Sequence, residues 1–352
     1  MRKGMVFFFL LVLFVFSAHS LVSGADVIKL KVAEFNPATH PTSGLAQKFC
    51  EEINKRTNGR VELSFYPGGI LLTAPKMFAG VTQGIADIGF SHVAYTRGRF
   101  PVTELFELPL GFPSSFVAGQ AYNDFYEHFK PAEWNGVHVF HFYTTAPALV
   151  QTTSKPIRTL EDLKGVKIRA TGQSSEVVKA LGGTPVPVEM PDLYESLRRG
   201  VIDGATLDLS PLKYYKFADV MKYVTTSWRV GTMYIFYCVM NTNKWNSLPP
   251  DIKKIFTDAA SELREKQVVL WDQIGMEGRD YFKSQGGQIV SLSDAETARW
   301  VKAVEPVIAA YKKDMVSKGY KEAEVDGWIS YAKERIEYWK KWEKEKGMPS
   351  VF

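Results

Sequence analysis

Cysteine and histidine are scarce in this chain, and their scarcity excludes several classes of protein. The 352 residues include two cysteines and six histidines. Two cysteines form no disulfide framework, and the lack of a CxxC motif or a close Cys/His cluster argues against a zinc site. Cys50 lies on the apolar face of a predicted helix and Cys238 in a strand-like run. We expect both to be buried as small apolar residues, with a disulfide between them as the alternative in an exported protein.

A strong excess of charge and the common catalytic motifs are also missing. The chain has 43 Lys and Arg against 38 Asp and Glu, a formal net charge of +5. This excess is too small to indicate a nucleic-acid partner. No GxxxxGKS/T, GxGxxG, GxSxG or HExxH motif occurs. The composition, 45% hydrophobic and 23% charged, is that of a globular protein. We expect no cofactor and no bound metal.

One long hydrophobic run is present, at the N-terminus. Residues 5–16 are apolar, follow Arg2 and Lys3, and precede the small residues Ser23, Gly24 and Ala25. This pattern is typical of a cleavable signal peptide over residues 1–25. The alternative is a membrane anchor, but the run is shorter than the ~20 residues that span a bilayer. We therefore expect export to the periplasm.

The rest of the chain alternates predicted strands and helices. Strands at 28–35, 61–67 and 85–90 are separated by helices at 40–59 and 74–84, and a similar order begins at about residue 137. Such βαβαβ patterns favour a largely parallel sheet with helices on its faces. The segments KMFAGVTQGIADIGF and PDLYESLRRGVIDGAT resemble each other, with Asp87 and Asp203 as structural partners of the turns. We predict two α/β lobes of similar design.

The C-terminal third is predicted to be mostly helical, at 247–269, 294–319 and 324–347. The last helix carries an aromatic stripe at helical spacing that includes Trp328, Tyr331, Trp339 and Trp342. Such a stripe must pack against apolar surface, either the lobes of this chain or a second copy. The sequence thus leaves open a monomer or a homodimer through the C-terminal helix.

Seven segments together resemble one family. They are HPTSGLAQKF, TNGRVELSFYPGGILL, GVTQGIADIGF, YTRGRFPVTELFELPLGF, QTTSKPIRTLEDLKGVKIRATG, LYESLRRGVIDGA and VMNTNKWNSLPPDIKKIF. In this order they resemble the solute receptor of TRAP (tripartite ATP-independent periplasmic) transporters, the DctP-like family, over residues 28–340. The resemblance implies capture of a small organic acid and its delivery to the small and large membrane subunits of a sodium-driven transporter.

The resemblance also implies an α/β fold, that of two-lobe periplasmic binding proteins, with a hinge between the lobes and long C-terminal helices. Residues 26–148 with 232–271 would form lobe I, and residues 149–231 with 272–312 would form lobe II. Residues 313–352 would pack across both lobes.

Several site residues follow from the resemblance. Arg169 in GVKIRATG matches the arginine that pairs with the ligand carboxylate in the family, and a guanidinium fork suits a carboxylate. Asn36 aligns with a loop position that hydrogen-bonds the ligand in relatives, and the alternative is that it only forms a turn. His92 is either a donor to the ligand or a structural histidine. Met190 aligns with an apolar residue over the ligand.

Two further positions, Trp228 and Arg229, sit where relatives often place polar residues near the hinge. Four more positions depart from the family and bear on ligand class. Val150 replaces a second arginine of relatives that bind acidic sugars. Thr206 stands where many relatives have Glu, Leu207 stands where they have Asn or Trp, and Asp208 follows. In one branch of the family, the Glu-Trp pair is associated with a metal-assisted site. We therefore predict a pocket without a metal that binds a monocarboxylate with an apolar body, aromatic or branched.

Two other functions stay open at the level of sequence. An exported enzyme acting on a small carboxylate would need an acid/base or nucleophile constellation, which the sequence does not show. A ligand sensor for a signalling partner would have the same sequence features as a transport receptor.

Overall fold

The computed structural model describes residues 27–349, so the predicted signal peptide lies outside the described residues. Alternating apolar residues build the first sheet: in β1, Leu30 and Val32 are buried whereas Lys29 and Lys31 are exposed. The strand order is β2 (Val61–Tyr66), β1 (Ile28–Glu34), β3 (Ile88–His92), β10 (Ile235–Asn241) and β4 (Val137–Thr144). Cys50 and Cys238 are free and buried in the core around this sheet.

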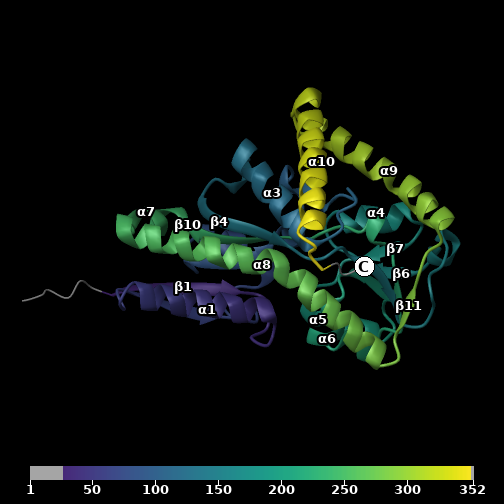
Figure 1. Ribbon diagram of the computed structural model, residues 1–352, viewed down its shortest axis with the longest axis horizontal. Coiled ribbons are helices and arrows are strands. Elements are labelled where there is room, and N and C mark those ends of the chain that lie inside the picture. The colour runs from purple at the N-terminus through teal and green to yellow at the C-terminus, as the bar shows by residue number, and fades with distance from the viewer. Residues whose placement is uncertain (1–26, 350–352) are drawn as a thin grey trace, which may run out of the picture.

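A second, six-stranded sheet forms the other lobe (Figure 1). Its strand order is β11 (Gln288–Val290), β9 (Tyr223–Thr225), β5 (Leu149–Thr152), β8 (Gly204–Leu207), β6 (Lys167–Arg169) and β7 (Thr184–Val186). The helices are α1 (Pro41–Arg56), α2 (Met77–Thr82), α3 (Ser115–Phe129), α4 (Ser174–Ala180), α5 (Met190–Arg198), α6 (Ser210–Tyr214), α7 (Thr242–Ser247), α8 (Pro250–Ser284), α9 (Asp294–Ser317) and α10 (Glu322–Glu345).

The prediction of largely parallel sheets is only partly right, because both sheets are mixed. The βαβαβ units give parallel pairs: β1 with β2 and β3, and β6 with β7 and β8. Strands β10 and β5, however, run antiparallel to both of their neighbours. The chain passes from β4 to β5, returns from β9 to β10, and passes to the second sheet again along α8, which leads to β11. The first two crossing segments are paired, with Ala148 N donating to Thr232 O at 2.9 Å.

The predicted role of Asp87 and Asp203 is confirmed. Asp87 Oδ2 accepts a hydrogen bond from Lys31 N at 2.7 Å, and Asp203 Oδ2 accepts one from Lys167 N at 2.8 Å. In return, the backbone N–H of each aspartate donates to the carbonyl of the same lysine. Each lobe therefore has the same pair of hydrogen bonds between an aspartate and a lysine of the neighbouring strand, as the similarity of the two segments predicted.

Helix α8 extends 15 residues beyond the predicted end at residue 269 and lies along both lobes (Figure 1). It packs against α1, α3 and β4 at one end and against α6 and β11 at the other. Gly275 and Gly278 lie in the extension, and glycine is a poor helix former. Gly278 is needed because a Cβ there would lie 2.0 Å from the Leu209 carbonyl oxygen.

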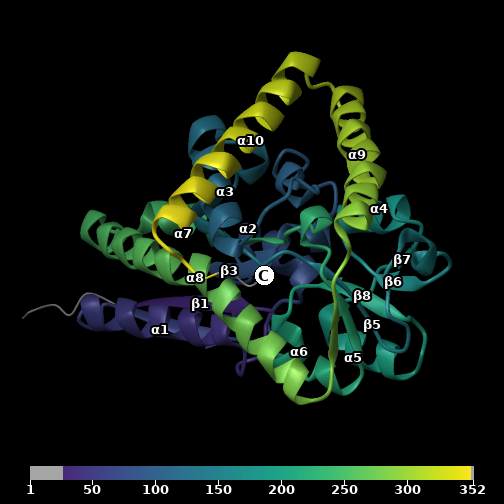
Figure 2. The same ribbon diagram turned by 45° about the vertical axis from the view of Figure 1, so that its right-hand side comes forward.

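The C-terminal helices form a hairpin across the molecule, with α9 against α4 and α10 against α3 (Figure 2). The aromatic stripe of α10 packs on this chain: the Phe116 ring lies 5.1 Å from that of Trp342 and 5.7 Å from that of Trp339. Asp124 of α3 accepts hydrogen bonds from Trp339 Nε1 and Arg335 Nε, both at 2.8 Å. Within residues 27–349, no helix has the length and apolar content to cross a membrane.

The close contact of α8 with α6 generates a stability prediction. Gly278→Ala would push a methyl group into the Leu209 carbonyl, and this overpacking should lower the stability by about 1–3 kcal/mol. Gly327→Ala is the matched control, because nothing lies within 4 Å of its Cβ in exposed α10. That change should raise stability by about 0.5–1 kcal/mol. Urea unfolding measures both, and equal midpoints for the two variants would contradict the packing described here.

Candidate functional site

A small cavity lies where the two lobes meet, near the carboxyl ends of β1, β3, β6 and β8. Open α/β sheets place ligand sites at this edge. The lining residues are Phe35, Asn36, His40, His92, Thr145, Arg169, Met190, Leu207, Asp208, Ser210, Pro211, Tyr215, Tyr234, Phe236 and Trp271. Both lobes and α8 thus contribute to one cavity. Within residues 27–349, no group of three or more His, Cys, Asp or Glu could hold a metal ion.

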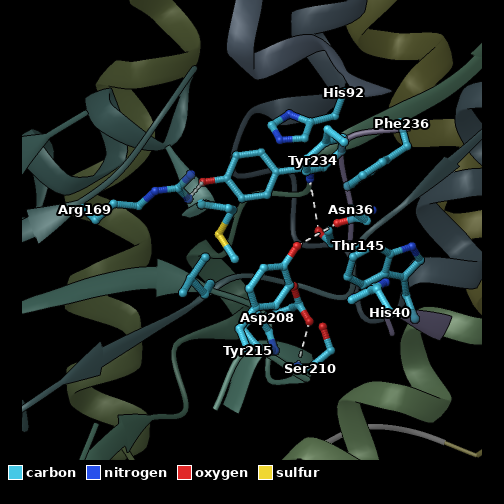
Figure 3. A pocket seen from close by; sticks show the side chains of 15 residues that line it. Asn36, His40, His92, Thr145, Arg169, Asp208, Ser210, Tyr215, Tyr234 and Phe236 are labelled. Atoms are coloured by element: carbon cyan, nitrogen blue, oxygen red, sulfur yellow. Dashed lines mark hydrogen bonds between the residues drawn. The ribbon is translucent and has the colours of Figure 1, made fainter. Parts of the chain in front are cut away.

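Arg169 is the cation of the cavity lining, at the end of β6, and its side chain reaches toward Tyr234 (Figure 3). The residue is only 1% exposed. Its Nε donates to the Val188 carbonyl at 2.9 Å, and one terminal nitrogen lies 3.4 Å from the Tyr234 hydroxyl. Among the described residues, no carboxylate forms an ion pair with it. A buried charge without a counter-ion is costly, so the site favours an anion from outside the chain.

His92 lies close to the arginine and faces the same cavity. Its ring centroid is 5.2 Å from that of Tyr234 and 5.0 Å from that of Phe236. Burial, together with the charge of Arg169, lowers the pKa of His92 well below its usual value, so the ring is neutral at pH 7. Its Nδ1 is buried without a partner among the described residues. His92 can therefore hydrogen-bond a ligand without adding charge.

Asn36 connects the lobes across the cavity. Its Oδ1 accepts a hydrogen bond from the Tyr215 hydroxyl at 2.9 Å (Figure 3). Its Nδ2 donates to Glu34 and Thr42, both at 3.1 Å. All the polar atoms of its side chain are thus occupied by protein partners. Asn36 orients Tyr215 in the cavity wall.

Asp208 is the only carboxylate in the lining. Its Oδ1 accepts a hydrogen bond from the backbone N–H of Ser210 at 2.8 Å. Burial raises its pKa from 3.8 to about 6, and the hydrogen bonds of Ser210 oppose this shift. At pH 7 the lining therefore carries one positive charge, Arg169, and one negative charge, Asp208.

A continuous aromatic surface lies between the arginine and the far end of the cavity. Ring contacts run from Tyr234 through His92 to Phe236, then to Trp271 at 5.2 Å, and finally to His40 at 5.4 Å. Phe35 stacks on Phe236 with centroids 5.9 Å apart. These rings offer an apolar wall for the body of a ligand.

The structure brings six of the ten predicted site residues to the cavity and leaves four outside it. The six are Asn36, His92, Arg169, Met190, Leu207 and Asp208. The four that do not line it are Val150, Thr206, Trp228 and Arg229. The ligand-binding role of all ten stays a prediction.

Each of the four outer residues has a structural position. Val150 and Thr206 face each other on β5 and β8, and the Thr206 hydroxyl donates to the carbonyl oxygen of Arg169 at 3.2 Å. Thr206 thus supports the strand behind the arginine. Exposed Arg229 lies 4.7 Å from the ring of Trp228, in a turn that packs against α9.

Sequence reasoning missed most of the aromatic and helical lining. Tyr234 directly precedes β10 and Phe236 is its second residue, and this period of two was a usable signal. His40 precedes Pro41, so its position as the N-cap of α1 was also readable. Trp271 lies in the unpredicted part of α8 among buried apolar residues, and no local pattern distinguishes it.

A small cavity enclosed between two α/β lobes, which are joined by crossing segments, defines a solute-binding receptor. The model of the bacterial extracellular solute-binding proteins, family 7, matches residues 32–314, and the chain belongs to this family. The resemblance noted in the sequence is thereby confirmed, together with the two-lobe fold. The members are binding receptors, so the function is that of a receptor and not of an exported enzyme.

Solved structures and curated relatives agree with this assignment. A TRAP periplasmic solute-binding protein of Desulfovibrio salexigens is 35% identical, with a TM-score of 0.77 over 88% of this chain and 96% of that chain. A marine metagenome TRAP receptor specific for aromatic acids, in complex with metahydroxyphenylacetate, is 26% identical, with a TM-score of 0.83 over 88% and 99%. The C4-dicarboxylate-binding protein of Bacillus subtilis is 25% identical over 82% of this chain and 83% of its own.

The buried carboxyl of Asp208 generates a pH prediction. Because its pKa is raised on folding, the folded chain binds more protons than the unfolded chain between pH 4 and 6, and stability falls as the pH rises through this window. Asp208→Asn should therefore stabilise the ligand-free protein by about 1–3 kcal/mol at pH 7 and by little at pH 3.5. Chemical unfolding at both pH values measures the difference.

Glu305→Gln, a change at an exposed position of α9, is the control and should show no such pH-dependent gain. A stability difference between Asp208→Asn and the wild type that is the same at both pH values would contradict the raised pKa.

Proposed function

We propose that this receptor captures a monocarboxylic acid with an apolar, aromatic or branched body, and delivers it to the small and large membrane subunits of a TRAP transporter. The observation that carries the proposal is the buried guanidinium of Arg169, which has no carboxylate partner among the described residues. A ligand carboxylate supplies the missing charge, and the planar fork of arginine can hold it with two hydrogen bonds.

The charges of the cavity favour one carboxylate over two. Arg169 is the only cation of the lining, because burial keeps His92 and His40 neutral at pH 7. A second ligand carboxylate would lose its water shell without a cationic partner, in a cavity that already holds Asp208. A dicarboxylate therefore fits less well than a monocarboxylate.

The aromatic rings of the lining support a ligand with an apolar body, but the residues that provide this surface differ in part from those on which the sequence-based prediction depended. That prediction depended on Val150 and Leu207, and only Leu207 lines the cavity. Phe35, Phe236 and Trp271 supply the apolar surface instead, and each Å² of apolar ligand area buried there contributes about 25 cal/mol. The aromatic-acid specificity of the marine metagenome receptor supports the same class, whereas the Bacillus subtilis relative makes C4-dicarboxylates the competing class.

The location and assembly of the receptor are part of the proposal. Relatives named as periplasmic binding proteins support export of this chain to the periplasm, with residues 1–25 as its cleavable signal peptide.

We propose lobe I as residues 26–148 with 232–271 and lobe II as residues 149–231 with 272–312, with residues 313–352 packing across them. The paired crossing segments near 148 and 232 support this division, although its other boundaries cut α8 and α9. The packing of the α10 stripe on α3 supports a monomer over a homodimer.

The role of Arg169 can be tested against a second arginine. Arg169→Ala should weaken binding of an aromatic monocarboxylate by at least about 100-fold, because the ligand carboxylate loses its charged partner. Arg169→Lys should also bind more weakly, since the bidentate geometry is lost. Arg229→Ala, outside the cavity, should leave the affinity unchanged. Calorimetry measures the three dissociation constants, and a thermal scan checks that each variant is folded.

If Arg169→Ala binds within a fewfold of wild type, or if Arg229→Ala causes the larger loss, the carboxylate is held elsewhere and the proposed site is wrong.

The ligand class can be tested with a competitive panel. Benzoate, phenylacetate and 4-methylpentanoate should bind more tightly than succinate, malate and sialic acid, because they need one charged partner and bury apolar area. A ligand that binds only the folded state raises the thermal midpoint, so a thermal-shift screen followed by calorimetry ranks them. Micromolar binding of succinate or malate without any response to the apolar acids would overturn the ligand class and leave the receptor function standing.

A further inference from the structure

Two buried polar groups line the end of the cavity away from Arg169 and have no hydrogen-bond partner among the described residues. They are His40 Nε2 and Trp271 Nε1. His40 is 1% exposed and Trp271 4%. Unpaired buried groups of this kind are rare in folded proteins, and two around one cavity indicate a ligand group that they bind.

Two tautomers of His40 are open, because the one proton of the Thr42 hydroxyl can go to His40 Nδ1 or to Glu34 Oε1, and the N-cap hydrogen bond favours the tautomer protonated on Nε2. His40 Nδ1 accepts a hydrogen bond from the Thr42 backbone N–H at 3.3 Å, as the N-cap of α1, and lies 2.7 Å from the Thr42 hydroxyl. Burial lowers the pKa of the ring to about 4, so it is neutral at pH 7. A neutral ring that accepts at Nδ1 carries its proton on Nε2. In this tautomer His40 presents an N–H donor to the cavity.

Trp271 presents a second donor beside the first. An indole Nε1–H can only donate, and the indole ring lies 5.4 Å from the ring of His40. Two neighbouring N–H donors match an oxygen atom that accepts. Asp208 and the Ser210 hydroxyl lie in the same lining and can accept the proton of a hydroxyl group.

The position of this pair relative to the arginine sets the shape of the ligand. His40 and Arg169 lie on opposite sides of the cavity in Figure 3, and the rings of Tyr234, His92 and Phe236 lie along its upper edge in that view. A ligand whose carboxylate is at Arg169 and whose body lies along these rings has its far end near His40 and Trp271.

From this arrangement we propose that His40 and Trp271 form a second, neutral polar subsite, and that the ligand is a carboxylic acid whose apolar body carries a hydroxyl or carbonyl oxygen at its far end. This inference rests on the proposed function, since it takes the carboxylate at Arg169 as given. A ligand with a plain hydrocarbon end leaves both donors unpaired in a dry site, and sites built to hydrogen-bond an oxygen discriminate against such analogues.

The test compares ligands of equal size with and without the oxygen. Benzoate and phenylacetate are measured by calorimetry beside their ring-hydroxylated and ring-methylated forms at the 3- and 4-positions. At one position at least, the hydroxyl form should bind about 10-fold more tightly than the methyl form. Trp271→Phe removes one donor and keeps a ring, and should reduce this preference to within about threefold.

A matched control and a second variant show whether the loss of the preference for the hydroxyl form is specific to the proposed subsite. Trp245→Phe alters a tryptophan stacked on His138 at 3.7 Å, away from the cavity, and should leave the preference intact. His40→Gln, which keeps a donor of similar reach, should retain more of the preference than His40→Ala.

The possible outcomes distinguish this inference from the proposed function. If the acids bind in an Arg169-dependent way but the methyl forms equal or exceed the hydroxyl forms, the subsite is wrong and the monocarboxylate receptor stands. A preference that persists undiminished in Trp271→Phe and His40→Ala also overturns it. If no monocarboxylate of the panel binds, the proposed ligand class fails and the subsite fails with it.

Discussion

The guanidinium of Arg169 is kept from water by residues of both lobes, and much of the site is organised around that one charge. Nε is used by the Val188 carbonyl, which orients the fork, and the strand beneath it is supported by Thr206. Desolvation of a cation without a counter-ion is unfavourable, and this is the reason for proposing that an anionic ligand binds there. The same charge contributes to keeping His92 neutral and thereby limits the cavity to one cationic group.

The arrangement of the two lobes follows from how the chain passes between them. Strands β5 and β10 receive the chain after its first two crossings and run antiparallel to their neighbours, so these crossing segments lie side by side behind the cavity. The hydrogen bonds that join the lobes on the cavity side include Tyr215 to Asn36 at 2.9 Å, and Gln173 to Glu104 at 2.8 Å. The hydrogen bond between Tyr215 and Asn36 is neutral and contributes about 1 kcal/mol, and the one to the Glu104 carboxylate about 1.5–3 kcal/mol. Ligand contacts to both lobes can therefore shift the balance toward closure.

The C-terminal hairpin adds a constraint on the lobes from the outside. Helix α9 packs on α4 of one lobe and α10 on α3 of the other, and the Asp124 contacts with Arg335 and Trp339 hold α10 in place. The long helix α8 contacts both lobes and carries Trp271 into the cavity wall. Elements remote in sequence thus contribute to the site and to the geometry that encloses it.

The sequence by itself determined the α/β class, the paired turns at Asp87 and Asp203, and the family, because these depend on short-range patterns and on motifs in fixed order. It also indicated Arg169, since the motif GVKIRATG marks that position in the chain. Val150 and Thr206 were predicted from the sequence to line the pocket, but they pair with each other on β5 and β8 and do not line the cavity. Only the tertiary structure decided that His40, Trp271 and Tyr234 meet Arg169 around one cavity. Their proximity comes from two chain crossings and a 35-residue helix, and no local pattern encodes contacts between segments so far apart.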